Sequence, residues 1–308
     1  MTPTGRVVVV DPLVDPETAR QRLAGLDVMV TGPEDRGHPD TVALVLGSEH
    51  PLAATELATM PALRIIATTS AGTDHLPVAA LHSAGIALAT AGDYSTTEVA
   101  DHTVALMLDL IRGISAQDRA MRRGEWPGLE APAPRRIAGT RVGLIGFGKI
   151  AYEVARRAVA LEMDVATHAP TADPERVRSV GAHQVPTLEH LLGWADIVSP
   201  HLPLTETTTG LLNRQRIAAM KPGAMLVNVS RGPIVEAQAL VDALNCGHLA
   251  GAALDVFDTE PPAADDPLLT CEQVVLTPHV AWRSVSSQQL AVDRALDAVR
   301  DALGAQAR

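Results

Sequence analysis

Short apolar runs rich in valine, isoleucine and alanine recur along the chain, and segments with helical spacing of apolar residues separate them. Runs that are apolar throughout are typical of strands buried on both faces, as in parallel sheets covered by helices. The alternation therefore predicts an α/β fold built on doubly wound parallel sheets. In the first hundred residues the predicted strands lie at 6–10, 27–30, 43–47, 64–69 and 86–90.

A second block of the same kind begins after residue 139 and predicts a second doubly wound domain. Residues 96–121 have apolar side chains at helical spacing and predict one long helix, and 124–139 predict a loop because they are rich in proline and glycine. The segment from 284 onward predicts a terminal helix. The predicted strands of this block lie at 140–146, 164–168, 197–201, 224–230, 251–256 and 273–278.

Charge and composition exclude several classes of protein. The chain has 25 Lys and Arg against 36 Asp and Glu, a formal net charge of −11, whereas a nucleic-acid partner requires a basic face. No apolar stretch is long enough for a signal peptide or a membrane span, so we expect no membrane partner. Two cysteines, Cys246 and Cys271, suggest neither a disulfide framework nor a metal site, and a cytoplasmic, reducing compartment suits them.

The string GFGKIA at 146–151 matches the dinucleotide fingerprint G-x-G-x-x-G/A. Gly146 permits a tight turn, and the missing side chain of Gly148 lets a pyrophosphate approach the backbone. Backbone N–H groups near Lys149 and Ile150 would then face the phosphates. Because the string follows a predicted strand and opens a predicted helix, it predicts a cofactor site and not merely a tight turn.

The position that normally selects NAD departs from the usual pattern. An Asp or Glu about 20 residues beyond the fingerprint would bind the ribose hydroxyls, but this chain has His168 and Ala169 there. The next carboxylate is Asp173, and Arg176 and Arg178 come later. The sequence leaves NAD and NADP both open, with a slight preference for tolerance of NADP.

Three polar residues follow apolar strands in the second half of the chain. Arg231 comes after 224–230, Glu260 lies in the string LDVFDTEPP, and His279 comes after 273–278. Ligands bind where the carboxyl ends of parallel strands meet. A carboxylate beside a histidine stabilises the protonated ring, and an arginine holds a carboxylate through two hydrogen bonds. Each residue alone is more often structural, but together, after a dinucleotide loop, they predict a catalytic site.

These strings resemble the D-isomer-specific 2-hydroxyacid dehydrogenases nearly from end to end. The resemblance implies a flavodoxin-like substrate domain, residues 1–98 and 285–308, into which a Rossmann coenzyme domain, residues 99–284, is inserted. The matching strings follow one another at 70–78, 92–103, 142–151, 201–213, 225–240, 252–262 and 274–282.

The resemblance also implies an activity, hydride transfer between NAD(P)H and a 2-oxo acid or D-2-hydroxy acid. Arg231 would bind the substrate carboxylate, and His279, tuned by Glu260, would exchange the proton. The backbone at Ala71 and Gly72 would also bind the substrate carboxylate. Carried over position by position, the cofactor contacts are Gly146, Gly148, Lys149, Ile150, His168, Ala169, His201, Pro203, Thr208, Val229, Ser230, Arg231, Asp255, His279, Ala281 and Trp282.

Two of the few aromatic residues lie in strings similar to the C-terminal-binding-protein branch of this family. The hypothesis is that Tyr94 and Trp282 contact substrate, with Trp282 projecting into the pocket. The alternative is that Trp282 only packs the hinge between the domains. Because corepressors of this branch and phosphite dehydrogenases keep the same Arg, Glu and His, a nucleotide-sensing binding protein and a phosphite-type dehydrogenase remain alternatives. The helix at 96–121 predicts a homodimer contact, with an intrachain core helix as the alternative.

Overall fold

The computed structural model describes residues 5–126, 128 and 133–304, and its backbone divides into two compact units. The split unit joins Met1–Tyr94 to Ser284–Arg308, and the inserted unit is Ser95–Arg283. The chain passes into the inserted unit at Ser95, just before helix α3, whereas the predicted domains placed this boundary after residue 98.

The split unit is built on a parallel sheet with the strand order β2-β1-β3-β4-β5. This is the order of flavodoxin-like doubly wound sheets, so the predicted fold class is confirmed for this unit. Strands form here because valine, isoleucine and alanine fit a sheet covered on both faces. The strands are β1 (Arg6–Val9), β2 (Met29–Thr31), β3 (Thr41–Leu46), β4 (Ile65–Thr68) and β5 (Ala87–Thr90).

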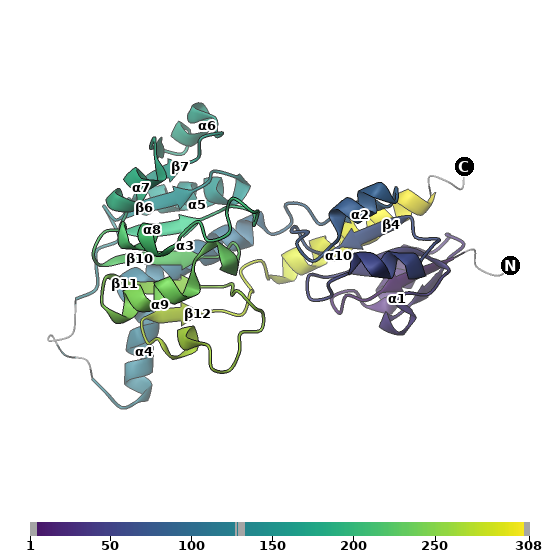
Figure 1. Ribbon diagram of the computed structural model, residues 1–308, viewed down its shortest axis with the longest axis horizontal. Coiled ribbons are helices and arrows are strands. Elements are labelled where there is room, and N and C mark those ends of the chain that lie inside the picture. The colour runs from purple at the N-terminus through teal and green to yellow at the C-terminus, as the bar shows by residue number, and fades with distance from the viewer. Residues whose placement is uncertain (1–4, 127, 129–132, 305–308) are drawn as a thin grey trace. The chain divides into compact units, whose positions relative to one another are not determined.

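Alternate residues of these strands enter two separate cores. Val7 and Val9 lie in a cluster with residues of α1 and α10, whereas Val8 packs on the opposite face of the sheet. Figure 1 shows α10, the yellow C-terminal helix, among the purple and blue elements of this unit. The helical elements are α1 (Pro16–Arg22), α2 (Val78–Ser83), α10 (Val285–Gly304), and the 3₁₀ turns η1 (Pro33–Asp35) and η2 (Ala54–Thr59).

The inserted unit has a longer parallel sheet, ordered β12-β11-β10-β9-β6-β7-β8. Counted within the unit, this is the classic Rossmann order with one further strand, and the order reverses between β6 and β9. The sequence did not predict the short strand β8. The strands are β6 (Arg141–Ile145), β7 (Asp164–His168), β8 (His183–Gln184), β9 (Ile197–Pro200), β10 (Ala224–Asn228), β11 (Leu249–Leu254) and β12 (Val274–Leu276).

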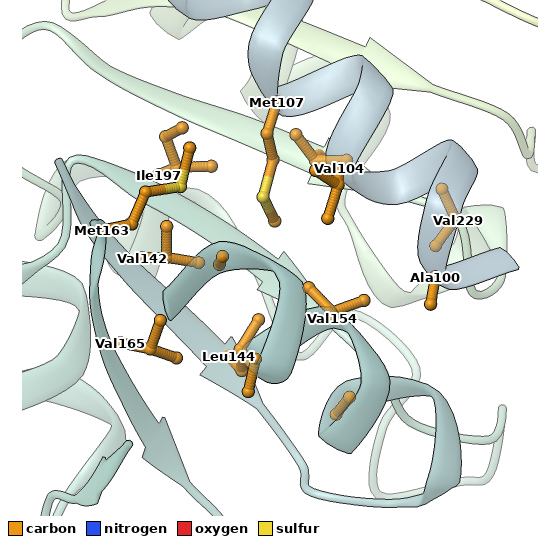
Figure 2. Close-up of a cluster of buried hydrophobic side chains, with 14 of the residues drawn as sticks. Ala100, Val104, Met107, Val142, Leu144, Val154, Met163, Val165, Ile197 and Val229 are labelled. Carbon is orange, nitrogen blue, oxygen red and sulfur yellow. The ribbon is translucent and has the colours of Figure 1, made fainter. Parts of the chain in front are cut away.

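Helices cover both faces of this sheet. Figure 2 shows Met107 and Val104 of α3 directed toward Val142 and Leu144 of β6, inside the cluster that α5 also enters. The opposite face carries a second cluster with residues of α7, α8 and α9. The helical elements are α3 (Thr96–Arg112), α4 (Ile114–Arg122), α5 (Lys149–Ala160), α6 (Pro174–Arg178), α7 (Leu188–Trp194), α8 (Arg214–Ala218), α9 (Ala237–Asn245), η3 (Gly232–Ile234) and η4 (Pro267–Thr270).

The single long helix predicted for 96–121 was wrong, because the chain breaks it at Gly113. This glycine has φ +64°, a left-handed conformation that ends α3 and starts α4. The Asp109 carboxylate accepts hydrogen bonds from the Ser115 N–H, at 2.7 Å, and from the Ser115 hydroxyl. The side-chain bond therefore fixes the break. The loop predicted for 124–139 lies partly outside the described residues.

Among residues 5–126, 128 and 133–304, no helix combines the length and the hydropathy needed to cross a membrane. Cys246 and Cys271 are both free thiols.

We expect Leu144→Ala to lower the free energy of unfolding of the inserted unit by about 2–5 kcal/mol, because the side chain is fully buried and its removal leaves a cavity. The protein's tryptophans, Trp126, Trp194 and Trp282, all lie in the inserted unit, so urea unfolding followed by tryptophan fluorescence reports on it. Leu269→Ala, at a side chain that is 42% exposed, is the matched control and should change the value by about 0.5 kcal/mol or less. Equal losses in both variants would contradict the assigned core.

Candidate active site

The glycine loop lies at the point where the strand order of the inserted sheet reverses. Gly146 follows β6 with φ +90°, and a Cβ there would lie 2.7 Å from the carbonyl oxygen of His201, which follows β9. Any side chain at Gly146 would therefore collide with the neighbouring strand end. A Cβ at Gly148 would meet no atom within 4 Å, so the space in front of this residue is open.

Helix α5 begins directly at this open space. Its N-cap is Gly148, and no side chain caps the helix by a hydrogen bond. The first turn therefore presents backbone N–H groups and the positive end of the helix dipole. Lys149 is exposed and Ile150 half-buried. This end of α5 fits the pyrophosphate of a dinucleotide.

Strand β7 runs beside the glycine loop and brings the ribose position next to it. The Gly146 N–H donates to the His168 carbonyl at 2.9 Å, so Ala169 directly follows the residue paired with the loop. Ala169 is buried and carries no charge. The Gln184 side-chain amide donates to the carbonyls of Ala169, at 3.0 Å, and Ala172, at 3.2 Å, and so fixes the segment after β7.

A further group of predicted cofactor residues follows β9 and β10 at the same sheet edge. The Thr208 hydroxyl donates to the Pro203 carbonyl at 2.7 Å, and the Ser230 hydroxyl donates to the Pro200 carbonyl at 2.6 Å. Val229 is buried beside Ser230. His201 is partly exposed as a residue, yet desolvation of its ring lowers its pKa to about 4. This imidazole is therefore neutral at pH 7.

The buried carboxylate of Asp255 shapes the turn that carries His279. It accepts hydrogen bonds from the Thr277 hydroxyl at 2.5 Å and from the N–H groups of Val280 and Ala281 at 2.9 Å each. His279 has φ +52°, which is uncommon for any residue with a side chain. Backbone strain of this kind clusters at functional sites, where surrounding bonds hold it. A cofactor contact for Asp255 stays a prediction.

Helix α3 also contributes to this network, through a residue that sequence reasoning missed. The His102 ring nitrogen Nε2 lies 3.1 Å from the Thr277 hydroxyl and 3.8 Å from Asp255. His102 belongs to the string 92–103, which the family resemblance included but to which no role was given. Nothing in its spacing pointed to a partner 175 residues away in the chain.

Glu260 and His279 form the central pair of the site. His279 Nδ1 lies 2.6 Å from Glu260 Oε2, and the Phe257 N–H donates to Glu260 Oε1 at 2.9 Å. Burial raises the pKa of Glu260, but the bonds from His279 and Phe257 and the charges of His279 and Arg231 outweigh it and hold the pKa below its usual value. An ionised carboxylate only accepts, so Nδ1 carries the hydrogen, and Nε2 is the nitrogen left for chemistry.

A close backbone contact brings Arg231 to this pair. A Cβ at Gly232 would lie 2.0 Å from the carbonyl carbon of Phe257, so only glycine lets the chain after β10 pass the segment that carries Glu260. The Arg231 Nη1 donates to the Ser230 carbonyl at 2.8 Å, and its charge helps to lower the pKa of Glu260. Glu260 thus lies beside His279, and the charge of Arg231 acts on Glu260.

Trp282 packs between the His279 turn and the core of the inserted unit. Its indole N–H donates to the His279 carbonyl at 3.0 Å, and its ring packs against the core cluster that contains Met107 and Leu144. The side chain therefore supports the turn from within the inserted unit. Its predicted contact with substrate stays a prediction.

The other predicted substrate residues belong to the split unit. Ala71 is exposed and Gly72 half-buried, in the segment that follows β4, and Tyr94 is buried. The Ser70 hydroxyl donates to the Gly72 carbonyl at 2.7 Å and lies 2.9 Å from the Thr68 hydroxyl. These bonds fix the backbone whose predicted role is to bind a carboxylate.

Within the ranges the structure describes, no three His, Cys, Asp or Glu side chains are grouped to hold a metal ion.

Comparison with known proteins adds to this geometry. The model of the D-isomer specific 2-hydroxyacid dehydrogenase NAD-binding domain matches residues 104–281. The crystal structure of a glyoxylate reductase from Paecilomyes thermophila superposes with a TM-score of 0.88 at 27% identity, over 98% of this chain and 96% of that one.

Curated relatives agree with the match. The chain is 34% identical over 293 residues to D-3-phosphoglycerate dehydrogenase of Archaeoglobus fulgidus, which covers 92% of this chain and 54% of that protein. It thus spans about half the length of several curated relatives. It is 37% identical over 251 residues to (S)-sulfolactate dehydrogenase of Chromohalobacter salexigens, over 82% of this chain and 81% of the other. With its fold, its glycine loop and these matches, the chain belongs to the D-isomer-specific 2-hydroxyacid dehydrogenase family.

Proposed function

We propose that this protein transfers hydride between NAD(P)H and a 2-oxo acid, with the D-2-hydroxy acid as the reduced product. The observation that carries the proposal is the 2.6 Å contact between His279 and Glu260, whose pKa the charge of Arg231 helps to lower. Relatives named for phosphoglycerate, sulfolactate and glyoxylate support a small acid as substrate.

Each residue of this group has a distinct task in the proposed reaction. Arg231 offers a planar cation with paired N–H donors, which fits a carboxylate and the neighbouring carbonyl oxygen. His279 donates a proton from Nε2 to the carbonyl oxygen during reduction and removes it from the hydroxyl during oxidation. Glu260 orients the ring through its contact with Nδ1.

The glycine loop and the start of α5 are the proposed cofactor contacts of the inserted unit. A bound NAD(P)H would supply the hydride. Gly146 and Gly148 would let the pyrophosphate lie against the backbone, and the strand ends after β9, β10 and β11 would line the same edge.

We expect His279→Ala to reduce the rate of 2-oxo acid reduction by about 10²–10⁴-fold, because the proton donor is lost. Dinucleotide binding should persist, since the glycine loop is untouched. Absorbance of NADH and NADPH with glyoxylate, hydroxypyruvate, pyruvate and bulkier 2-oxo acids measures the rate, and calorimetry measures binding. His190→Ala, at an exposed histidine of α7, is the control. If His279→Ala retained the wild-type rate on the best substrate, the proposed mechanism would be wrong.

Glu260→Gln should slow 2-oxo acid reduction by about 10–100-fold, the worth of one hydrogen bond to a charged group. The Glu260 carboxylate accepts the Nδ1 hydrogen of His279 at 2.6 Å, and its pKa is held below its usual value, so it is ionised at neutral pH. The amide keeps a similar shape but can turn its NH₂ group toward Nδ1, and the ring is then no longer held. The NADH and NADPH absorbance assay measures the rate, and a variant with the wild-type rate would rule out this positioning role of Glu260.

We also propose a homodimer that uses α4. Ile114 and Met121 of this helix are 60% and 49% exposed, and Trp126 beyond it is 84% exposed. Exposed apolar side chains gathered on one element are typical of an interface. Sedimentation equilibrium should give about twice the chain mass of 32.4 kDa. Met121→Glu should shift the mass toward the monomer, and a wild-type mass near that of one chain would refute the dimer.

A further inference from the structure

Arg176 of α6 places its positive charge against the glycine loop. Its guanidinium carbon lies 5.1 Å from the ring centre of Tyr152 and 6.0 Å from that of Phe147. Its two terminal nitrogens lie 3.5 Å from the carbonyl oxygens of Phe147 and Gly148. These partners belong to the fingerprint and the first turn of α5. The rings of Tyr152 and Phe147 and the two carbonyls therefore hold the Arg176 guanidinium at the edge of the glycine loop.

The neighbouring strand end offers no carboxylate to balance this charge. Ala169 stands where an acidic residue would bind the ribose hydroxyls, and its Gln184 contacts keep this segment in place. The nearest acid along the chain, Asp173, accepts a hydrogen bond from the Glu175 N–H at 2.9 Å as the N-cap of α6. Of the ion pairs found among residues 5–126, 128 and 133–304, none includes Arg176.

The acidic residue nearest on α5 is also engaged elsewhere. Glu153 follows Tyr152 in the helix and forms ion pairs with Arg156, at 2.9 Å, and Arg157. Those hydrogen bonds lower the pKa of Glu153, so it is ionised and already neutralised by its own partners. The charge of Arg176 can therefore attract an anionic ligand that binds at the glycine loop.

We propose that Arg176 forms a 2′-phosphate subsite, so that this protein prefers NADP(H) to NAD(H). The inference rests on the proposed function and names the cofactor of that same site. A guanidinium fits a phosphate through paired hydrogen bonds, and the missing carboxylate at Ala169 removes the repulsion that would exclude a 2′-phosphate. The same absence takes away the usual acceptor for the ribose hydroxyls of NAD(H).

Binding measurements on the intact protein test this subsite without reference to turnover. Isothermal titration calorimetry should give a lower dissociation constant for NADPH than for NADH. Arg176→Ala should weaken NADPH binding by about 10–100-fold and leave NADH binding nearly unchanged, because it removes a charged hydrogen-bond donor from the phosphate alone. Arg178→Ala, two residues along the same helix and exposed, is the matched control and should change neither constant.

A smaller ligand and a negative charge introduced at residue 169 provide two further tests. 2′,5′-ADP should compete with NADPH better than 5′-ADP does, and this difference should disappear in Arg176→Ala. Ala169→Asp should reverse the preference, because a carboxylate there binds the ribose hydroxyls and repels the 2′-phosphate. If Ala169→Asp fails to fold, the Arg176 series and the competition with 2′,5′-ADP still decide the matter.

The binding results distinguish failure of the 2′-phosphate subsite from failure of the proposed function. The 2′-phosphate subsite would be overturned if the wild-type protein bound NADH as tightly as NADPH, or if Arg176→Ala weakened the binding of both cofactors equally. The proposed dehydrogenase activity would then still stand. Wild-type protein that binds neither dinucleotide would overturn both.

Discussion

The geometry of the candidate site depends on the buried carboxylate of Asp255. Its two oxygens accept the Thr277 hydroxyl and two consecutive backbone N–H groups, and these bonds hold His279 in a left-handed conformation. A buried carboxylate needs such donors, because an unpaired charge in the interior is costly. One turn therefore supplies the hydrogen bonds that Asp255 requires and also fixes the position of His279. His102 extends the network to α3 and so connects the turn to the central helix of the inserted unit.

The second constraint is the contact at Gly232. Arg231 and Glu260 follow different strands, β10 and β11, and the backbone after β10 passes Phe257 so closely that Gly232 has no room for a side chain. The charge of Arg231 helps to lower the pKa of Glu260 across this approach. The Phe257 N–H also binds Glu260, so one short segment both admits Arg231 and orients the carboxylate that supports His279. Backbone contacts at the edge of the sheet thus determine where the side chains of Arg231 and Glu260 lie.

The sequence predicted most of what is local and little of what joins distant segments. Apolar strands and the fingerprint at 146–151 are set by neighbouring residues, so both were predicted and lie within a few residues of their observed positions. The break at Gly113 was missed because a glycine within a helical pattern does not by itself end a helix, and the deciding bond comes from Asp109. The pairing of His102 with Thr277 could not be predicted, since it depends on how α3 packs on the sheet.

The two sheets have related topologies but differ in the side chains at the point where the strand order reverses. In the split unit, Asp11 fills this position. Its carboxylate is buried and accepts the Leu13 N–H at 2.8 Å and the Thr69 hydroxyl, and its Oδ2 lies 2.8 Å from the place that a Cβ on Gly47 would take. The first helix there is capped by the Asp15 carboxylate, whose bonds with Thr18 lower its pKa, so a negative charge already occupies the helix end. In the inserted unit the same place has Gly146 and Gly148, no side-chain cap and open space. A phosphate would meet a carboxylate at α1 and uncapped N–H groups at α5, so side chains at the helix start, and not topology, decide which sheet suits a dinucleotide.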